Sequence, residues 1–182
     1  MVSTHLITAA ELENMGSDAP FELIKGVLYE VSPSSFDSSE FGMRLGIILG
    51  SYVFEHGLGF LTGADGGYLL ERGPDTVIAP DVGFIRNERS NLRPRGRGFF
   101  PAHPDLAVEI ISPTDERADI RRKMDLYERT SVPLVWWVDP IKRTVTVQRA
   151  GQPVARLTEF DSLDGEDIIP GFSIQLAILF DF

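Results

Sequence analysis

The pattern of apolar and polar positions first predicts three helices. The first opens with Thr8 and Glu11, which match a capping box, a reciprocal pair that satisfies backbone N–H groups at a helix start. The longest has apolar residues every three or four positions, as a helix packed on a sheet would. The predicted ranges are 8–16, 37–57 (opened by Asp37 and Glu40) and 114–129 (capped by Thr114).

Short apolar runs between turn signals predict a series of strands. The strand, helix, strand order over residues 106–138 implies a crossover with parallel neighbours, whereas the meander before it implies antiparallel strands. The fold class is therefore α/β (α+β): a mixed sheet flanked by helices, with an N-terminal antiparallel meander and a C-terminal hairpin. The predicted strands are 21–24, 27–31, 60–62, 68–70, 77–78, 82–85, 106–111, 134–138, 144–148 and 154–159.

Composition narrows the class of protein. The 182 residues, 43% hydrophobic and 24% charged, are typical of a single globular domain over residues 1–182. The chain has no cysteine, which excludes disulfides, thiol nucleophiles and thiolate metal sites. We see no signal-peptide pattern and no apolar stretch long enough to cross a membrane, so a cytoplasmic location is expected.

The net charge of −10 at first argues against a nucleic-acid partner, because phosphate binding needs lysine and arginine. The distribution is uneven, however. Residues 86–123 hold nine basic and six acidic side chains, so this segment carries +3 and the rest of the chain −13. Part of this segment, residues 87–104, is rich in Gly, Pro and Arg, a composition that predicts a surface loop. A solvated connector would explain its arginines equally well.

Two acids stand in or beside apolar strand runs. Asp81 follows Pro80 at the end of the run 76–79, and Glu109 lies inside 106–111. An acid in such a run costs folding energy unless it is paired, hydrogen-bonded or bound to a cation. Two of them on neighbouring strands would suit Mg²⁺ or Mn²⁺, as in many metal-dependent nucleases. A two-carboxylate hydrolase such as a glycosidase is an alternative.

Several ordered motifs together resemble the Uma-type restriction endonuclease family of the PD-(D/E)XK nuclease superfamily. Each is weak alone, but as an ordered set they cover most of the chain from residue 21 to the end. They are the segments 21–26, 79–82, 104–113, 132–140 and 169–172, with Arg117, Asp119, Lys123 and Tyr127 between them.

This resemblance implies one restriction-endonuclease-like domain that hydrolyses DNA phosphodiesters with Mg²⁺ or Mn²⁺. By analogy Asp81, Glu109 and the backbone carbonyl of Ile110 hold the metal, and Glu22 could reach it. Ile111 occupies the position where the superfamily has its catalytic lysine. The family supplies that lysine from the following helix, at the position of Lys123, although a solvent-facing structural lysine is the alternative.

The remaining expectations concern surrounding residues and partners. Arg117 and Asp119 could orient Lys123 or form a helix-surface ion pair. The arginines of the loop could contact DNA phosphates, and a homodimer is possible. Trp136 and Trp137 are expected in the core rather than stacked on bases. A catalytically inactive nuclease-fold protein that binds nucleic acid or protein is the competing interpretation. The five loop arginines are Arg86, Arg89, Arg93, Arg95 and Arg97.

Overall fold

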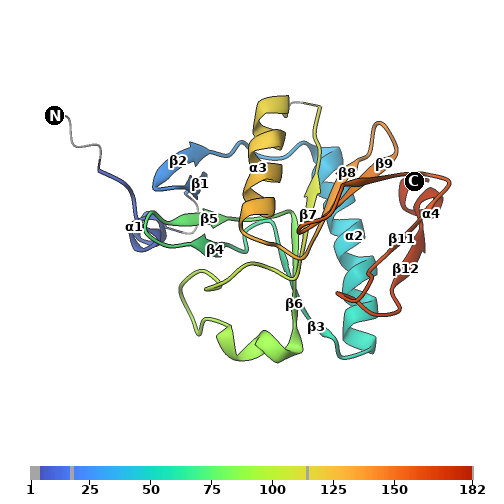
Figure 1. Cartoon of the computed structure of the whole chain (residues 1–182), viewed down its shortest axis with the longest axis horizontal. Coiled ribbons are helices and arrows are strands. Elements are labelled where there is room, and N and C mark those ends of the chain that lie inside the picture. Colours follow the sequence, from blue (N-terminus) through green and yellow to red (C-terminus); the bar gives the residue numbers. More distant parts are fainter. Residues whose placement is uncertain (1–4, 17–18, 114, 182) are drawn as a thin grey trace.

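The computed structural model describes residues 5–16, 19–113 and 115–181, which form β-sheets with helices packed against them (Figure 1). The helices are α1 (Ala9–Asn14), α2 (Phe36–Glu55), α3 (Arg117–Arg129) and α4 (Leu176–Phe180), with a 3₁₀ segment η1 (Asn87–Leu92). The strands are β1 (Phe21–Ile24), β2 (Val27–Glu30), β3 (Gly59–Gly63), β4 (Tyr68–Glu71), β5 (Thr76–Ile78), β6 (Val82–Arg86), β7 (Leu106–Ile110), β8 (Leu134–Asp139), β9 (Thr144–Arg149), β10 (Ala155–Thr158), β11 (Ser162–Asp164) and β12 (Ser173–Gln175).

The largest sheet has six strands in the order β10-β9-β8-β7-β6-β3. Strands β7 and β8 are parallel and are joined through α3, while the other neighbours are antiparallel. This confirms the predicted mixed sheet with one crossover unit. The parallel pair is central and fully covered, which explains why both strands are almost continuously apolar.

Helices α2 and α3 cover opposite faces of this sheet. Because side chains alternate along a strand, Val108 and Ile110 of β7 pack with α2, while Ala107 packs with α3. The two tryptophans of β8 divide in the same way. Trp136 lies on the α2 side and Trp137 on the α3 side, and both are buried. They are core residues, as the sequence indicated.

The N-terminal strands form a second, four-stranded antiparallel sheet in the order β2-β1-β5-β4. The predicted hairpin turn is present, with Lys25 and Gly26 at φ of 53° and 76°. Positive φ at both central residues is what a type I′ hairpin turn requires. The meander was predicted, but not its separation into a sheet of its own. In this separate sheet, β1 and its Glu22 lie close to α3, the helix that covers one face of the large sheet.

Two helix starts differ from the sequence prediction. Helix α2 begins at Phe36, because the Ser35 side chain accepts the N–H of Ser38 and acts as the cap in place of Asp37. Helix α3 begins at Arg117 after Glu116, and the expected cap Thr114 lies outside the described residues. The capping box of Thr8 and Glu11 at α1 is confirmed. None of the helices within the described ranges has the length and apolar character needed to span a membrane.

Candidate active site at the end of the parallel strands

Glu109 is the penultimate residue of β7 and lies on the sheet face covered by α3. Its side chain is buried, and the Tyr127 hydroxyl donates a hydrogen bond of 2.5 Å to Oε1. Burial raises the pKa of Glu109 to about 7; Asp81 and Glu22 add to the rise, while Lys123 and Tyr127 oppose it. Glu109 is therefore a carboxylate held in place by α3 and sensitive to any cation brought near it.

Lys123 stands one helical turn before Tyr127 on α3 and extends towards the same carboxylate. Its Nζ lies 3.3 Å from Glu109 Oε2 and 2.9 Å from Glu22 Oε1. Burial lowers the pKa of the ammonium, but Glu109 and Glu22 outweigh it and raise the pKa above its usual value. The ammonium thus stays charged beside Glu109. Ile111 instead packs against the apolar cluster beneath α3.

Asp81 lies directly before β6, at the same end of the sheet as Glu109, since Val82 pairs with Val108. Its Oδ2 accepts the backbone N–H of Ile110 at 2.7 Å. Burial raises the pKa of Asp81, although this hydrogen bond and the Lys123 charge partly offset the effect. Asp81, Glu109 and Lys123 therefore form one electrostatic cluster at the end of β7.

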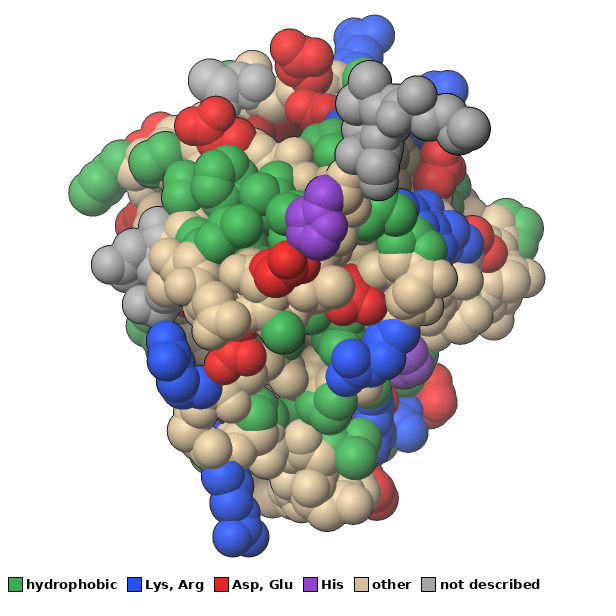
Figure 2. Space-filling view, turned by 90° about the vertical axis from the view of Figure 1, so that its left-hand side faces the viewer, with side chains coloured by type: hydrophobic (Ala, Val, Ile, Leu, Met, Phe, Trp, Pro, Cys, Tyr) green, Lys and Arg blue, Asp and Glu red, His purple; other side chains and the backbone are tan. Residues whose placement is uncertain are grey.

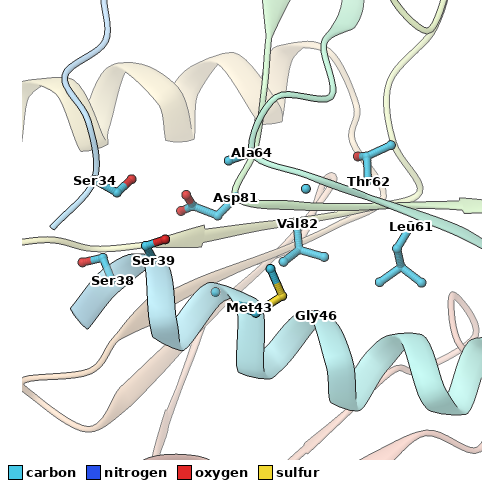
Figure 3. Close-up of a pocket in the computed structure, with 12 residues that line it drawn as sticks. Ser34, Ser38, Ser39, Met43, Gly46, Leu61, Thr62, Ala64, Asp81 and Val82 are labelled. Carbon is cyan, nitrogen blue, oxygen red and sulfur yellow. The ribbon is translucent and has the colours of Figure 1, made fainter. Parts of the chain in front are cut away.

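The Asp81 side chain also lines a cavity of about 310 Å³ between α2 and the β3 strand (Figure 3). Figure 3 shows its carboxylate near Ser34 and Ser39, with Met43 further along the helix. Most of the remaining lining is small or apolar, including Gly42. One acid of the cluster thus borders a cavity large enough for a small ligand.

The donor set suits a hard divalent cation. Glu22, Asp81 and Glu109 with Lys123 carry a net charge of −2 when all four are ionised, and two of the acids have raised pKa values. A divalent cation would offset that charge. Among the described residues, no group of three or more His, Asp or Glu side chains converges as metal ligands. The protein share of a metal site here would be two carboxylates and a backbone carbonyl, such as that of Ile110.

The other residues expected around Lys123 have different contacts. Asp119 forms an ion pair with Arg122 at 2.7 Å, and the Arg122 guanidinium lies over the Tyr29 ring at 4.1 Å. Arg117 is exposed. The described ion pairs of Lys123 are with Glu22 and Glu109, so the suggested orienting role of Asp119 is not supported. Tyr127 was among the motif residues but received no role from the sequence, although a spacing of four from Lys123 places both on one helix face.

The loop arginines divide into two groups. Arg86 donates to the Asp167 carbonyl at 2.6 Å, and Arg89 pairs with Asp105 at 2.9 Å, so both are used inside the protein. Arg93 lies over the Phe60 ring, while Arg95 and Arg97 are exposed. The segment leaves β6 at the end opposite Asp81. The face of the molecule around β1 and β2 is also not a single basic surface. Figure 2 shows acidic and basic side chains mixed there.

Comparisons with known proteins agree with this architecture. Residues 8–177 match the family Uma2, described as "Putative restriction endonuclease". No curated protein matches. Among solved structures, one similar chain is described as a putative nuclease belonging to DUF820 from Anabaena variabilis. The similarity has a TM-score of 0.80 at 17% identity and covers 96% of this chain and 98% of that one. At this identity the similarity establishes the fold. Because the family match spans nearly the whole chain, the protein belongs to the Uma2 family.

Proposed function

We propose that this protein is a metal-dependent endonuclease that hydrolyses DNA phosphodiesters. The observation that carries the proposal is the position of Lys123. The superfamily pattern needs a lysine next to the metal-binding glutamate, and residue 111 cannot provide it. In the structure, Lys123 from α3 places its ammonium 3.3 Å from Glu109. This proximity supports a catalytic role for Lys123, and the family membership supplies the nuclease context.

The proposed roles follow from the surroundings of each side chain. Asp81 and Glu109 would hold Mg²⁺ or Mn²⁺, with the Ile110 carbonyl as a further oxygen donor. When bound, such a cation supplies Lewis-acid stabilisation of a phosphate and lowers the pKa of bound water. Lys123 would offset negative charge developing on the phosphate. Glu22 and Tyr127 hold Lys123 and Glu109 in these orientations through the ion pair and the hydrogen bond described above.

The alternatives are weaker on these observations. A glycosidase is not supported by the family or the fold. A catalytically inactive nuclease-fold protein was suggested by Ile111 and by the acidic net charge. The position of Lys123 argues against the first of these points, whereas the charge leaves the DNA-binding surface to be tested. Cytoplasmic location and homodimer formation are further expectations that accompany the proposal.

Cleavage of a supercoiled plasmid with Mg²⁺ or Mn²⁺ tests the proposal. Glu109→Gln should abolish cleavage and also abolish the thermal stabilisation that either ion gives. Glu128→Gln is the matched control, because Glu128 is an exposed acid of the same helix whose described hydrogen bond is to the Gly151 N–H. Wild-type protein that binds the ions but never cuts would favour the inactive alternative. Melting shifts that persist in both Glu109→Gln and Asp81→Asn would place the ion elsewhere.

The role of Lys123 needs a separate comparison. Lys123→Ala should keep metal and DNA binding but reduce cleavage by a factor on the order of 10² or more, as when a preorganised donor is removed. Lys142→Ala is the control, since Lys142 is an exposed lysine whose described ion pair is with Asp139 in the β8–β9 turn. Cleavage by Lys123→Ala at the wild-type rate would show that the lysine on α3 has no part in the reaction.

A further inference from the structure

Helix α2 carries a second apolar face that covers nothing within the described structure. Its members are Phe36, Met43, Ile47 and Phe54, whose exposed fractions are 85%, 67%, 60% and 73%. At 100° per residue, their spacings of seven, four and seven place all four within a sector of about 40°. The opposite side of the helix, with Leu45, is buried in the core. We refer to the four residues as the α2 ridge.

We propose that the α2 ridge is a homodimer interface, in which two copies of the chain pair their α2 helices antiparallel. The spacing is symmetric about the middle of the helix. An antiparallel two-fold pairing therefore sets Phe36 against the partner subunit's Phe54, and Met43 against the partner subunit's Ile47. Such an isologous interface needs one self-complementary patch, which the ridge provides. Antiparallel helices also bring opposite ends of their dipoles together.

The size of the ridge matches a weak but specific dimer. Four large side chains exposed to this degree offer roughly 500 Å² per subunit, or about 1,000 Å² in total, near the lower limit for specific interfaces. Small residues beside the ridge, Ser39 and Gly46, would let the helices approach closely. The nearest acid, Glu40, already pairs with Arg44 on its own helix, so it would not enter the interface uncompensated.

Outside the ridge, two described large apolar side chains are exposed by 70% or more, and they do not lie together. Ile141 and Phe160, at 70% and 86% exposure, lie singly in separate turns. Single exposed apolar side chains are normal on soluble proteins, whereas four along one 20-residue helix form a patch. Met43 belongs both to the ridge and to the lining of the Asp81 cavity. A partner at the ridge would therefore form part of the wall of that cavity.

Sedimentation analysis tests the interface without relying on the proposed nuclease activity. Wild-type protein should be a dimer at concentrations above the micromolar range expected for this area. Met43→Glu with Ile47→Glu should be monomeric with an unchanged circular dichroism spectrum, because both positions face solvent in the monomer. Ile141→Glu with Phe160→Glu should dimerise like wild type. A monomeric wild type, or a dimer that persists in the ridge variant, would overturn the proposal.

Cysteine cross-linking tests the orientation, because the chain has no cysteine of its own. A mixture of Phe36→Cys and Phe54→Cys chains should form a disulfide-linked heterodimer on mild oxidation. Either variant alone should not, since positions 36 and 54 are 18 helical steps apart, which separates them by about 27 Å along the helix. Efficient cross-linking of Phe36→Cys to itself would indicate a parallel pair and refute the antiparallel arrangement.

Discussion

Glu109 is the residue where burial and charge oppose each other most strongly. Its carboxylate has a raised pKa of about 7 despite the Lys123 ammonium and the Tyr127 hydroxyl, both of which favour the charged form. Burial, together with the nearby charges of Asp81 and Glu22, therefore disfavours the charged form of Glu109 more than the ammonium and the hydroxyl favour it. A site built in this way gains from any further positive charge, which is the physical reason to expect cation binding there.

The pKa of Glu109 predicts a pH dependence of stability in metal-free protein. Between about pH 4.5, its ordinary value, and about pH 7, the folded state holds a proton that the unfolded chain has released. Stability should therefore fall as pH rises through this window, by at most about 3 kcal/mol. Urea unfolding at several pH values should show this decline in wild type and its absence in Glu109→Gln. If the variant declines as steeply as wild type, another group is responsible.

At the scale of single residues, the sequence predicted which side chains are candidate site residues and which segments carry them, but not which side chains pair with each other. Asp81 and Glu109 were recognisable as candidates because acids in apolar runs are unusual. The pairing of Lys123 with Glu22 was not predictable. Lys123 lies on α3, which covers the large sheet, whereas Glu22 lies on β1 of the small sheet, and only the folded chain brings the two together. The Tyr127 hydrogen bond depends on side-chain rotamers, which a spacing rule does not supply.

At the scale of elements, Glu71 of β4 joins three segments. Lys25 of the β1–β2 turn and the Thr76 hydroxyl each lie 2.7 Å from its carboxylate, and Arg129 at the end of α3 lies 3.3 Å away. Partial burial acts to raise the pKa of Glu71, but these hydrogen bonds outweigh it and lower the pKa to about 2. The small sheet is thus fastened to α3 through one carboxylate.

Glu71→Gln should weaken this connection in a pH-dependent way. A lowered pKa contributes stability that is present above the ordinary value near 4.5 and is lost as pH falls towards about 2. The variant should be less stable than wild type at neutral pH, by about 1–2 kcal/mol. The difference should shrink on acidification, and denaturant unfolding measures it. Glu30→Gln, at an exposed site on β2, is the control and should show no such trend.

Element prediction succeeded where the determining interactions are local. The Thr8–Glu11 capping box and the Lys25-Gly26 turn need only residues within a few positions, and both are present. The start of α2 was misplaced because Ser35 and Asp37 are both good caps, and the choice depends on how the chain enters the helix. The division of the strands into separate sheets depends on long-range packing that no local pattern encodes.

At the scale of the whole molecule, the separation between the arginine loop and the carboxylates affects how DNA is expected to bind. The loop begins at the far end of β6. Arg86, the last residue of β6, and Arg89 are engaged within the protein. Arg95 and Arg97 are exposed. If DNA passes over the loop while the scissile phosphate lies near Glu109, it must span the length of β6. The internally engaged arginines should then matter for folding more than for affinity.

Salt dependence of DNA binding distinguishes these two groups of arginines. Arg95→Ala with Arg97→Ala should reduce the slope of log affinity against log salt by about 0.9 for each duplex phosphate that an arginine no longer neutralises. Arg89→Ala should instead lower the free energy of unfolding, because the buried Asp105 carboxylate loses its ion-pair partner. An unchanged slope in the Arg95 and Arg97 double variant would identify the loop as a solvated connector.

The placement of the lysine on a helix rather than on β7 has a consequence for mutational tolerance. A lysine at position 111, directly after β7, would be held by the backbone hydrogen bond that residue 111 donates to Val138, which few substitutions can shift. Lys123 is held by the packing of Leu126 and Tyr127, which are both fully buried. Conservative exchanges at these core positions would turn or slide α3 and move the ammonium with it. If the site is catalytic, selection for activity therefore extends into the hydrophobic interior of α3, and turnover should vary among packing variants of equal stability.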